Sequence, residues 1–467
     1  MSACLLGGGA AAQVRLPDIG DASGGALSLA DERRLGEAFM REVRAQLTVV
    51  DDPEVESYAQ GLGSRLSATA ETTGGFTVFV VASDAINAFA GPGGFIGMHS
   101  GLILGTESES ELASVLAHEM AHVTQRHIAR AFEMADRTSL SALAGLLAAL
   151  VIGTQNSQAG QAAVAAVSGV QAQRALDFSR ANEQEADRVG MQLLAEAGFD
   201  PRSMPTFFER LQNAVRYYRR PPEYLSTHPV TTSRIADSRS RAEQFPYRQH
   251  ADSLGYALVK ARLRVLTTRD PKEALAWFED ALQSERYRSL EATAYGWALA
   301  LARLGRHTQA VEVLEKLVDD HPDRVQFRAA LGDTLLRAGQ DARAVTVYRE
   351  AQSLFPDDAT VIRGYGRALI ASGESPAALR LIDDHARLHG MDAALHKLAA
   401  EAYQRTGQTA RGQLALAEHY YQTGQAELAI HQLRMASRDR DADYFVTAQA
   451  TARLRELEQE QEERTRR

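Results

Sequence analysis

The chain contains almost no cysteine. Cys4 is the only one among 467 residues, which excludes an intramolecular disulfide and a cysteine-ligated metal cluster. Positive charge is also scarce, because 51 lysines and arginines stand against 60 aspartates and glutamates, for a net charge of −9. This balance lacks the basic footprint of a general nucleic-acid binder, so no nucleic-acid partner is expected. The composition is otherwise that of a folded protein, with 45% apolar and 24% charged residues, and the length suggests two or three domains.

Long hydrophobic runs are also missing. Residues 140–153 are the nearest candidate for a membrane span, but they are shorter than the ~20 residues that a spanning helix needs. They belong to an uncharged segment, residues 138–173. This segment is compatible with a buried helix pair, with an amphipathic flap that covers a site or makes peripheral membrane contact, or with a true span.

The N-terminus differs in amino-acid composition from the rest of the chain. Residues 1–14 resemble the end of a signal peptide, because a short apolar stretch is followed by small residues, although the basic region is missing. Export is therefore expected, with the signal apparently truncated. Residues 15–30, rich in glycine, serine and aspartate, are expected to form an extended arm.

Residues 31–245 combine helical and strand patterns. Apolar residues at helical spacing predict helices over residues 30–47, 53–68, 109–135 and 183–197. Runs of β-branched and aromatic residues predict strands over residues 76–82, 86–89 and 95–104. A Gly-Pro-Gly-Gly turn separates the last two strands.

Residues 252–462 show an internal period of 34. The repeated positions are Gly305, Gly339, Gly373 and Gly407, then Ala276, Ala310, Ala344 and Ala378, and finally Pro322 and Pro356. Glycine suits the tight turn between two helices, alanine their crossing, and proline the end of a unit. Three anchor types in one register indicate tetratricopeptide repeats. Such solenoids bind polypeptides on a concave face, although a packing module without a ligand is the alternative.

The residues His118-Glu119-Met120-Ala121-His122 form an H-E-x-x-H motif within a predicted helix. Residues four apart lie on one helix face, so both imidazoles can point at one metal ion, and imidazole nitrogens suit zinc. Glu119 lies beside them, where it can take a proton from water that the metal activates. The motif therefore predicts hydrolysis, with His118 and His122 as ligands and Glu119 as the base.

A zinc site with one open position needs a third protein ligand from another element. Glu183 and Asp187 are candidates because they stand four residues apart in the next predicted helix. In this interpretation Glu183 binds the metal, and Asp187 orients a ligand histidine. Glu185 is the rival ligand. The acidic residues could instead form only a solvated helix start, where acids are favoured.

In this order the motifs resemble the HtpX-type gluzincin metalloproteases, most closely their periplasmic BepA-like branch. The shared features are HExxH, a downstream ExxxD formed by Glu183 and Asp187, and a helical repeat region. Residues 87–90, with the glycine-rich turn after them, resemble the active-site edge strand of the family. The segment Thr227-His228-Pro229, with Ser233-Arg234 beyond it, resembles another shared stretch. The likeness extends from residue 15 to about residue 460.

The resemblance implies a ligand set. One zinc ion per chain would be held by His118, His122 and Glu183, with Glu119 as general base and acid. His228 could reach the zinc as a fourth ligand, although a histidine before a proline is more often a loop residue. As a ligand it would close the open position and hold the enzyme latent.

The resemblance also implies supporting roles. Asp187 would steady a ligand histidine. Arg234 would steady Asp187 or a developing oxyanion, unless it forms only a surface ion pair. Asn87, Ala88 and Phe89 would form the edge strand that pairs with the main chain of the substrate.

Other residues with chemical potential are expected to be structural. His127 follows His122 by five residues, about 140° around a continuous helix, so it should not reach the same site. His99 lies on a predicted strand and is expected to be structural. Trp277 and Trp297 in the repeats are expected to be core residues.

The sequence therefore predicts an α+β gluzincin metalloprotease domain, mostly helical with a small sheet, over residues 31–245. An all-α tetratricopeptide solenoid follows over residues 252–462. The resemblance implies a zinc endopeptidase with a chaperone-like role, which degrades misfolded or stalled outer-membrane β-barrel precursors in the periplasm. The repeats would dock on the barrel-assembly machinery. The alternatives are a scaffold or chaperone with a latent protease site, and a cytoplasmic protease if residues 1–14 are not a signal.

Overall fold

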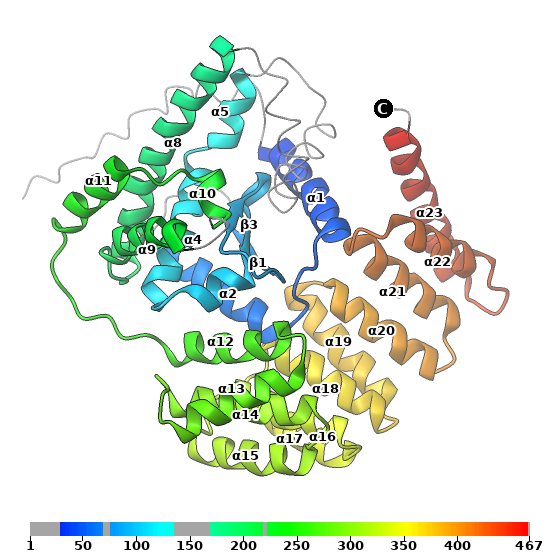
Figure 1. Cartoon of the computed structure of the whole chain (residues 1–467). Helices are drawn as coiled ribbons and strands as arrows, with labels where there is room; N and C mark the ends of the chain where they lie inside the picture. Colours follow the sequence, from blue (N-terminus) through cyan, green and yellow to red (C-terminus); the bar gives the residue numbers. More distant parts are fainter. Residues whose placement is uncertain (1–28, 69–74, 135–168, 218–221, 466–467) are drawn as a thin grey trace, which may run out of the picture.

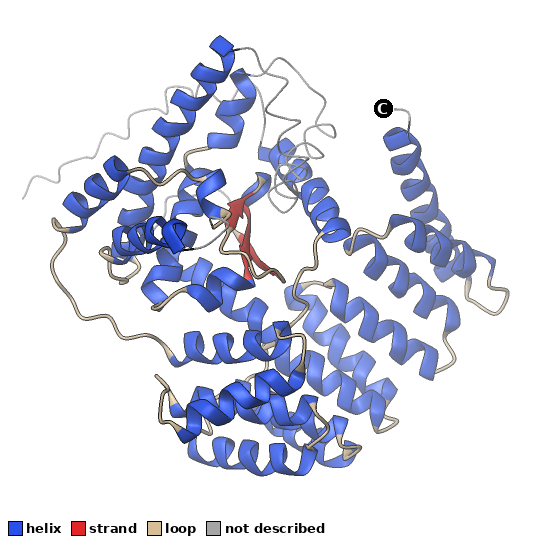
Figure 2. Cartoon of the chain, viewed as in Figure 1, coloured by secondary structure: helices blue, strands red, loops and turns tan. Residues whose placement is uncertain are grey.

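The computed structural model of the chain describes residues 29–68, 75–134, 169–217 and 222–465. Figure 1 shows an N-terminal region, residues 29–242, in which helices surround a small sheet. A solenoid of paired helices, residues 254–465, curves alongside it. Helices dominate both parts, and the strands form one small patch (Figure 2). The prediction of a mostly helical α+β region followed by all-α repeats is confirmed.

The N-terminal region contains the sheet and the helices around it. Its strands are β1 (Thr77–Val81), β2 (Ala88–Ala90) and β3 (Phe95–His99). Its helices are α1 (Leu29–Gln46), α2 (Pro53–Ser67), η2 (Pro92–Gly94), α3 (Ser100–Gly105), α4 (Glu109–Thr124), α5 (His127–Met134), α8 (Gly169–Glu196), α9 (Ser203–Tyr217), α10 (Tyr224–Thr227) and α11 (Thr232–Ala242).

The solenoid consists of helices that pair in sequence. They are α12 (Leu254–Thr267), α13 (Pro271–Gln283), α14 (Leu290–Arg303), α15 (His307–Asp320), α16 (Val325–Arg337), α17 (Asp341–Leu354), α18 (Ala359–Ala371), α19 (Ser375–His389), α20 (Ala393–Arg405), α21 (Thr409–Gln422), α22 (Ala426–Arg438) and α23 (Tyr444–Thr465).

The sheet has the strand order β1-β3-β2. The central strand β3 runs parallel to β1 and antiparallel to β2, with Ala88 opposite Met98. The turn that joins β2 to β3 contains Gly93 and Gly94 at φ values of 71° and 80°, a conformation that glycine adopts without steric cost. The predicted strand–turn–strand unit is therefore confirmed, with β2 on the outside of the sheet.

The last predicted strand is shorter than expected, because α3 begins at Ser100. The Ser100 hydroxyl donates to the Ser83 carbonyl at 2.8 Å, and the Gly101 amide donates to the same oxygen at 2.8 Å. A Cβ on Gly101 would lie 2.2 Å from the carbonyl oxygen of Asp84. These bonds and this close approach turn the chain from strand to helix, which the apolar pattern did not reveal.

The predicted helix over residues 109–135 is interrupted. α4 ends at Thr124, Arg126 has a φ of 53°, and α5 begins at His127. Positive φ is uncommon for a residue with a side chain and redirects the chain. Arg126 is also tied to α1, because its guanidinium donates to Glu32 at 3.1 Å. The 140° angle between His122 and His127, calculated for one continuous helix, therefore does not apply.

The repeat register is largely confirmed. All four turn glycines have φ between 71° and 86°, and Ala310, Ala344 and Ala378 are fully buried. Ala276 is instead exposed on α13, whose buried face is formed by Ala274, Leu275, Phe278 and Ala281. The prediction of a core tryptophan is wrong for Trp277, which is 45% exposed under the guanidinium of Arg264. Trp297 packs against the core as expected.

α12 belongs to two hydrophobic cores at once. Tyr256, Val259 and Leu263 pack into the core of the N-terminal region, whereas Leu258, Ala261 and Val265 pack into the core of the solenoid. Each set follows the i, i+3, i+7 spacing of one helix face. α12 therefore joins the two parts through apolar contacts on opposite sides.

Several sequence predictions lie outside the described residues. These concern the possible signal at residues 1–14, most of the arm at 15–30, and most of the uncharged segment at 138–173. Within the ranges that the structure describes, no helix has both the length and the apolar character needed to cross a membrane.

Candidate metal centre

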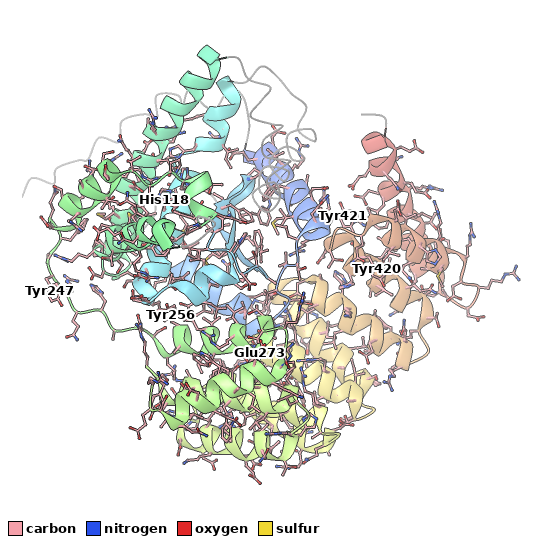
Figure 3. The ribbon with its side chains drawn as sticks, in the orientation of Figure 1. His118, Tyr247, Tyr256, Glu273, Tyr420 and Tyr421 are labelled. Atoms are coloured by element: carbon pink, nitrogen blue, oxygen red, sulfur yellow. The ribbon has the colours of Figure 1, made fainter. Side chains whose placement is uncertain are left out.

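α4 places the HExxH motif inside the N-terminal region. Its start is capped by Ser108, whose hydroxyl accepts a hydrogen bond from the Glu111 amide at 3.2 Å, which favours helix formation. His118 is 0% exposed and Glu119 is 1% exposed, while the His122 side chain keeps 13% exposure near the end of the helix. The motif therefore faces the protein interior, where Figure 3 labels His118.

α8 crosses α4 at very close range. A Cβ on Gly190 would lie 3.0 Å from both the Ala117 carbonyl oxygen and the His118 amide nitrogen. Glycine therefore permits an approach of the two backbones that a larger residue would prevent. Asp187 and Glu183, three and seven residues before Gly190, consequently reach the His118 side chain from α8. A glycine in the middle of a helical pattern was the signal for this crossing, and the sequence interpretation missed it.

Four side chains from three elements converge on one point. His118 and His122 come from α4, Glu183 from α8, and His228 from the residue after α10. Their candidate ligand atoms all lie within 4.8 Å of one another. The Nε2 atoms of His118 and His122 are 3.1 Å apart, and Glu183 oxygens lie 3.5 and 3.3 Å from them. His228 Nδ1 lies 3.4 Å from His118 Nε2 and 2.9 Å from Glu183 Oε1.

These distances fit a single zinc ion. Ligand bonds of about 2.0–2.2 Å in a tetrahedral arrangement place the ligand atoms about 3.3–3.6 Å apart, close to the 2.9–3.5 Å observed. The charge also fits, because the buried carboxylates of Glu119, Glu183 and Asp187 face one buried guanidinium, that of Arg234. With neutral histidines, a divalent cation would balance the remaining negative charge.

Asp187 and Arg234 hold the other side of His118. The Asp187 Oδ1 atom lies 3.0 Å from His118 Nδ1, and Arg234 donates to both oxygens of Asp187 at 2.8 Å. Arg234 also lies 2.8 Å from Glu183 Oε2 and donates to the Pro229 carbonyl oxygen at 2.8 Å. Arg234 is only 4% exposed, so the alternative of a surface ion pair is wrong.

The carboxylates attract positive charge to this position. Burial alone would lower the pKa of His118, but Asp187 and Glu183 outweigh burial and raise it to about 10. Burial alone would raise the pKa of Glu183, but His228, His118 and His122 hold it well below its ordinary value. The carboxylates around His118 therefore favour positive charge at this position.

His228 is held against the cluster by the short helix α10. The Tyr224 amide donates to the Ile86 carbonyl oxygen at 3.1 Å, which ties α10 to the chain just before β2. The Tyr224 ring, fully buried, lies 4.8 Å from the His228 ring. The other ring nitrogen of His228, Nε2, lies 3.3 Å from Glu119 Oε1. His228 thus contacts both the candidate base Glu119 and the other cluster residue Glu183. No sequence pattern had indicated the role of Tyr224.

Comparison with known proteins agrees with this geometry. Residues 50–242 match Peptidase family M48, and residues 295–359 and 335–402 match tetratricopeptide repeats. The chain is 34% identical to the beta-barrel assembly-enhancing protease of Yersinia pestis, over 91% of this chain and 88% of that one. It is 32% identical to the protein of the same name from Escherichia coli K12, over 90% and 87% of the two chains.

The chain belongs to the beta-barrel assembly-enhancing protease family. It is an M48 metalloendopeptidase with a metal-binding cluster of His118, His122, Glu183 and His228. The chain is also similar to the mitochondrial metalloendopeptidase OMA1 of Danio rerio, with 34% identity over 43% of each chain.

The break after α4 brings His127 into contact with a member of the cluster of this protease. Its Nδ1 atom lies 2.8 Å from His122 Nδ1, and its Nε2 atom lies 3.2 Å from Glu185. Arg130 donates to the same Glu185 oxygen at 2.9 Å. His127 thus contacts a ligand residue although the continuous-helix angle predicted no approach, but it is not among the four described residues whose ligand atoms converge, as expected. Glu185, the rival ligand, faces His127 on this side rather than the cluster.

The predicted substrate-binding residues of this protease lie on and beside the outer strand β2. Asn87 precedes β2, and its carbonyl oxygen accepts a hydrogen bond from the His99 amide at 3.0 Å. Ala88 is fully buried and Phe89 is 7% exposed. The Phe89 ring contacts those of Phe79 and His99 edge to face. β2 is thus anchored through its side chains, whereas a substrate would pair with its main chain, a role that stays a prediction.

His99 is structural in its surroundings, as expected. It is 0% exposed at the end of β3, and neither ring nitrogen has a hydrogen-bond partner among the residues that the structure describes. Burial lowers its pKa to about 4, so the ring is neutral at physiological pH.

Proposed function

We propose that this protein is a zinc-dependent endopeptidase, with one zinc ion per chain, that acts on polypeptides during outer-membrane β-barrel assembly. The observation that carries this proposal is the convergence of His118, His122 and Glu183 on one point, with Glu119 beside them. Zinc in this site would supply a Lewis acid that activates water and polarises the scissile carbonyl group.

The residues around the zinc site would transfer protons and position the ligands. Glu119 would accept the proton from the attacking water and pass it to the leaving amine, as general base and then general acid. Its burial at 1% exposure limits competition from bulk solvent. Asp187 would fix the ring orientation of His118 through Nδ1, and Arg234 would hold Asp187 in turn. Arg234 is thus a positioning residue, because its guanidinium is occupied by Asp187, Glu183 and Pro229.

Substrate would bind by strand addition along β2. Within the described residues β2 pairs on one side with β3, and strand addition to an outer strand supplies affinity through main-chain hydrogen bonds. Asn87, Ala88 and Phe89 would form this edge. A stalled β-barrel precursor carries unpaired strands that suit such a site, which supports misfolded or stalled outer-membrane β-barrel proteins as substrates.

The position of His228 favours a second function. With His228 as the fourth ligand, the open position of the zinc would be filled and the resting enzyme would be nearly silent. The chain would then act mainly as a scaffold or chaperone through its repeats, with proteolysis released when His228 withdraws. The contact of His228 with both Glu183 and Glu119 supports this latent state.

The relatives' name supports the cellular setting that we propose. In this setting the chain works in the periplasm, and its tetratricopeptide region docks on the barrel-assembly machinery. A chaperone-like role in quality control accompanies proteolysis. Peripheral membrane contact through residues 138–173 stays a prediction, because most of that segment lies outside the described residues.

The test compares the native chain with Glu119→Gln and with Glu107→Gln. Glu107 is a matched control because its side chain is 65% exposed and lies outside the cluster. The substrates are an unfolded outer-membrane β-barrel precursor and an unfolded all-α protein of equal length. We expect one zinc per chain in all three proteins by elemental analysis. Glu119→Gln alone should lose cleavage of the precursor, by about 10²–10⁴-fold.

Two results would contradict the proposal. Native-rate cleavage by Glu119→Gln would remove Glu119 as the base, and native protein without stoichiometric zinc would remove the metal. Faster cleavage of the all-α protein than of the precursor would contradict the substrate class but leave the hydrolytic chemistry intact.

A further inference from the structure

The inner face of the solenoid forms a groove that is lined by charged side chains. This solenoid groove has a volume of about 430 Å³ and is lined by residues of α12, α14, α16, α18 and α20 and of the segment that precedes α2. Figure 1 shows where these helices lie in the solenoid. Its cationic residues are Arg262, Arg303, Arg337, Arg363, Arg367 and Lys397. Its carboxylates are Asp51, Asp52, Asp333 and Glu401. The described lining therefore has a positive surplus of two, in a chain of net charge −9.

These charges follow the 34-residue register of the repeats. Equivalent positions on successive helices supply Asp333, Arg367 and Glu401, then Arg303 and Arg337, and finally Arg363 and Lys397. Successive positions are four residues apart within a repeat, as in Asp333 and Arg337 or Arg363 and Arg367, so they lie on the same face of each helix. Stacking of the repeats turns this face into one continuous charged surface.

The solenoid groove already accepts an acidic segment of the same chain. Residues 51–56 contain four carboxylates. Two of them reach Arg262, at 2.7 Å from Asp52 and 2.9 Å from Glu54. The other two approach Arg363, at 3.0 Å from Glu56 and 3.9 Å from Asp51. The inner face of the repeats thus recognises side-chain carboxylates, and the rest of the groove offers the same chemistry.

The remaining cations are available to a partner. Among the residues that the structure describes, Arg337 and Lys397 are exposed and form no ion pair. Arg303 donates only to the backbone carbonyl groups of Val265 and Thr268. Leu266, which is 45% exposed, lines the same groove and adds an apolar contact.

We propose that the solenoid groove binds an acidic segment of a partner polypeptide. Its carboxylate side chains would pair with Arg303, Arg337 and Lys397, next to the position of the chain's own residues 51–56, and an apolar side chain would contact Leu266. Carboxylate recognition would thus be the chemistry of the docking role in the proposed function. The proposal rests on that function only in taking the partner to be a protein.

The test uses the full-length Glu119→Gln protein, so that binding is measured without cleavage. The probe is a fluorescein-labelled, C-terminally amidated peptide with three repeats of Glu-Leu-Asp-Ala, followed by fluorescence anisotropy. Adding Arg337→Glu and Lys397→Glu together should weaken binding at least tenfold. Raising NaCl from 50 to 500 mM should also weaken it, because exposed charge pairs are screened by salt. Adding Arg380→Glu, an exposed position on α19 outside the groove, should leave binding unchanged.

Two matched peptides complete the test. The amide version, three repeats of Gln-Leu-Asn-Ala with an amidated end, should not bind. If it binds as tightly as the acidic peptide, the apolar residues dominate and the proposal is overturned. The second peptide has the same amide sequence with a free terminal carboxylate. If it binds where the amidated version does not, the ligand is a chain end and the proposal is equally wrong. Because binding is read on a protein without the candidate base, failure here leaves the zinc proposal untouched.

Discussion

The metal centre and the solenoid groove both concentrate charge, but they use it in opposite ways. Glu183, Asp187 and Arg234 are at most 5% exposed, and Arg234 forms an ion pair with each of the two carboxylates. Arg337 and Lys397 are exposed and have no ion-pair partner among the described residues. Removing one member of a buried pair leaves an uncompensated charge and costs about 3–5 kcal/mol, whereas an exposed pair contributes about 0–1 kcal/mol. Buried charges therefore fix geometry for chemistry, and exposed charges remain available for recognition.

The largest effect should come from removing a ligand of the metal centre. His118→Ala should lose the stoichiometric zinc and reduce proteolysis about a thousandfold or more, because Lewis-acid catalysis contributes several kcal/mol. Elemental analysis and a peptide-cleavage assay would measure both. His389→Ala, on the solenoid and outside the cluster, is the control and should retain zinc. A His118→Ala protein that still holds one zinc per chain would contradict this prediction, because the loss of a histidine would then have no more effect on zinc in the metal centre than in the solenoid.

The next largest effect should come from the helix that the two regions share. A fragment that ends at residue 251 lacks Tyr256, Val259 and Leu263, whose burial in the N-terminal core contributes roughly 5–9 kcal/mol. A fragment that ends at residue 269 keeps them. We expect the longer fragment to bind zinc and unfold cooperatively, and the shorter one to melt at a much lower temperature by circular dichroism. Equal melting temperatures would show that the protease part folds independently of α12.

A smaller effect is expected from the contact behind His122. His127→Ala should weaken zinc binding by about 10- to 100-fold, because the partner of a ligand histidine fixes its ring orientation. Competition with a chelator would measure the affinity, and the absorption spectrum of the cobalt-substituted protein would report the changed ligand field. Arg130→Ala, which removes one of the two partners of Glu185 and leaves His127 in place, should have a weaker effect. An unchanged affinity in His127→Ala would rule out positioning.

The smallest expected change, and an increase rather than a loss, concerns latency. His228→Ala should raise proteolysis or self-cleavage several-fold while zinc stays bound to the other three ligands. Thr227→Ala, at the exposed neighbouring position, is the control. Unchanged activity would argue against latency, and a loss would assign His228 to the binding of substrate or the transition state. Either result would also weaken the scaffold alternative.

The sequence predicted the parts of the molecule that repeat or that follow a fixed spacing. The HExxH motif predicts two ligands on one helix face because of helix geometry. The glycines spaced by 34 residues predict the solenoid. Glu183 could be separated from Glu185 only by the resemblance, because both stand on the same predicted helix. The structure puts the two on different sides, with Glu183 at the cluster and Glu185 at His127.

The features that were missed depend on backbone conformation or on distant contacts. The break at Arg126 sits in an uninterrupted helical pattern, and its bond to Glu32 joins residues that are 94 positions apart. Tyr224 is positioned by a hydrogen bond from its backbone amide to the Ile86 carbonyl oxygen, which carries no side-chain signal. Trp277 is exposed because α13 buries the face formed by Ala274, Leu275, Phe278 and Ala281, and residue 277 lies outside that face.

The glycine at the crossing of α4 and α8 has a consequence for how the centre tolerates change. Because Gly190 brings two main chains into contact at Ala117 and His118, the spacing between the two ligand-bearing helices is set by backbone atoms rather than by adjustable rotamers. A slip of one residue along α8 would rotate its carboxylates by about 100° away from α4, so intermediate arrangements are excluded. Side chains around this crossing can therefore be exchanged without changing the distance between the metal ligands of the two helices, as long as position 190 has no Cβ atom.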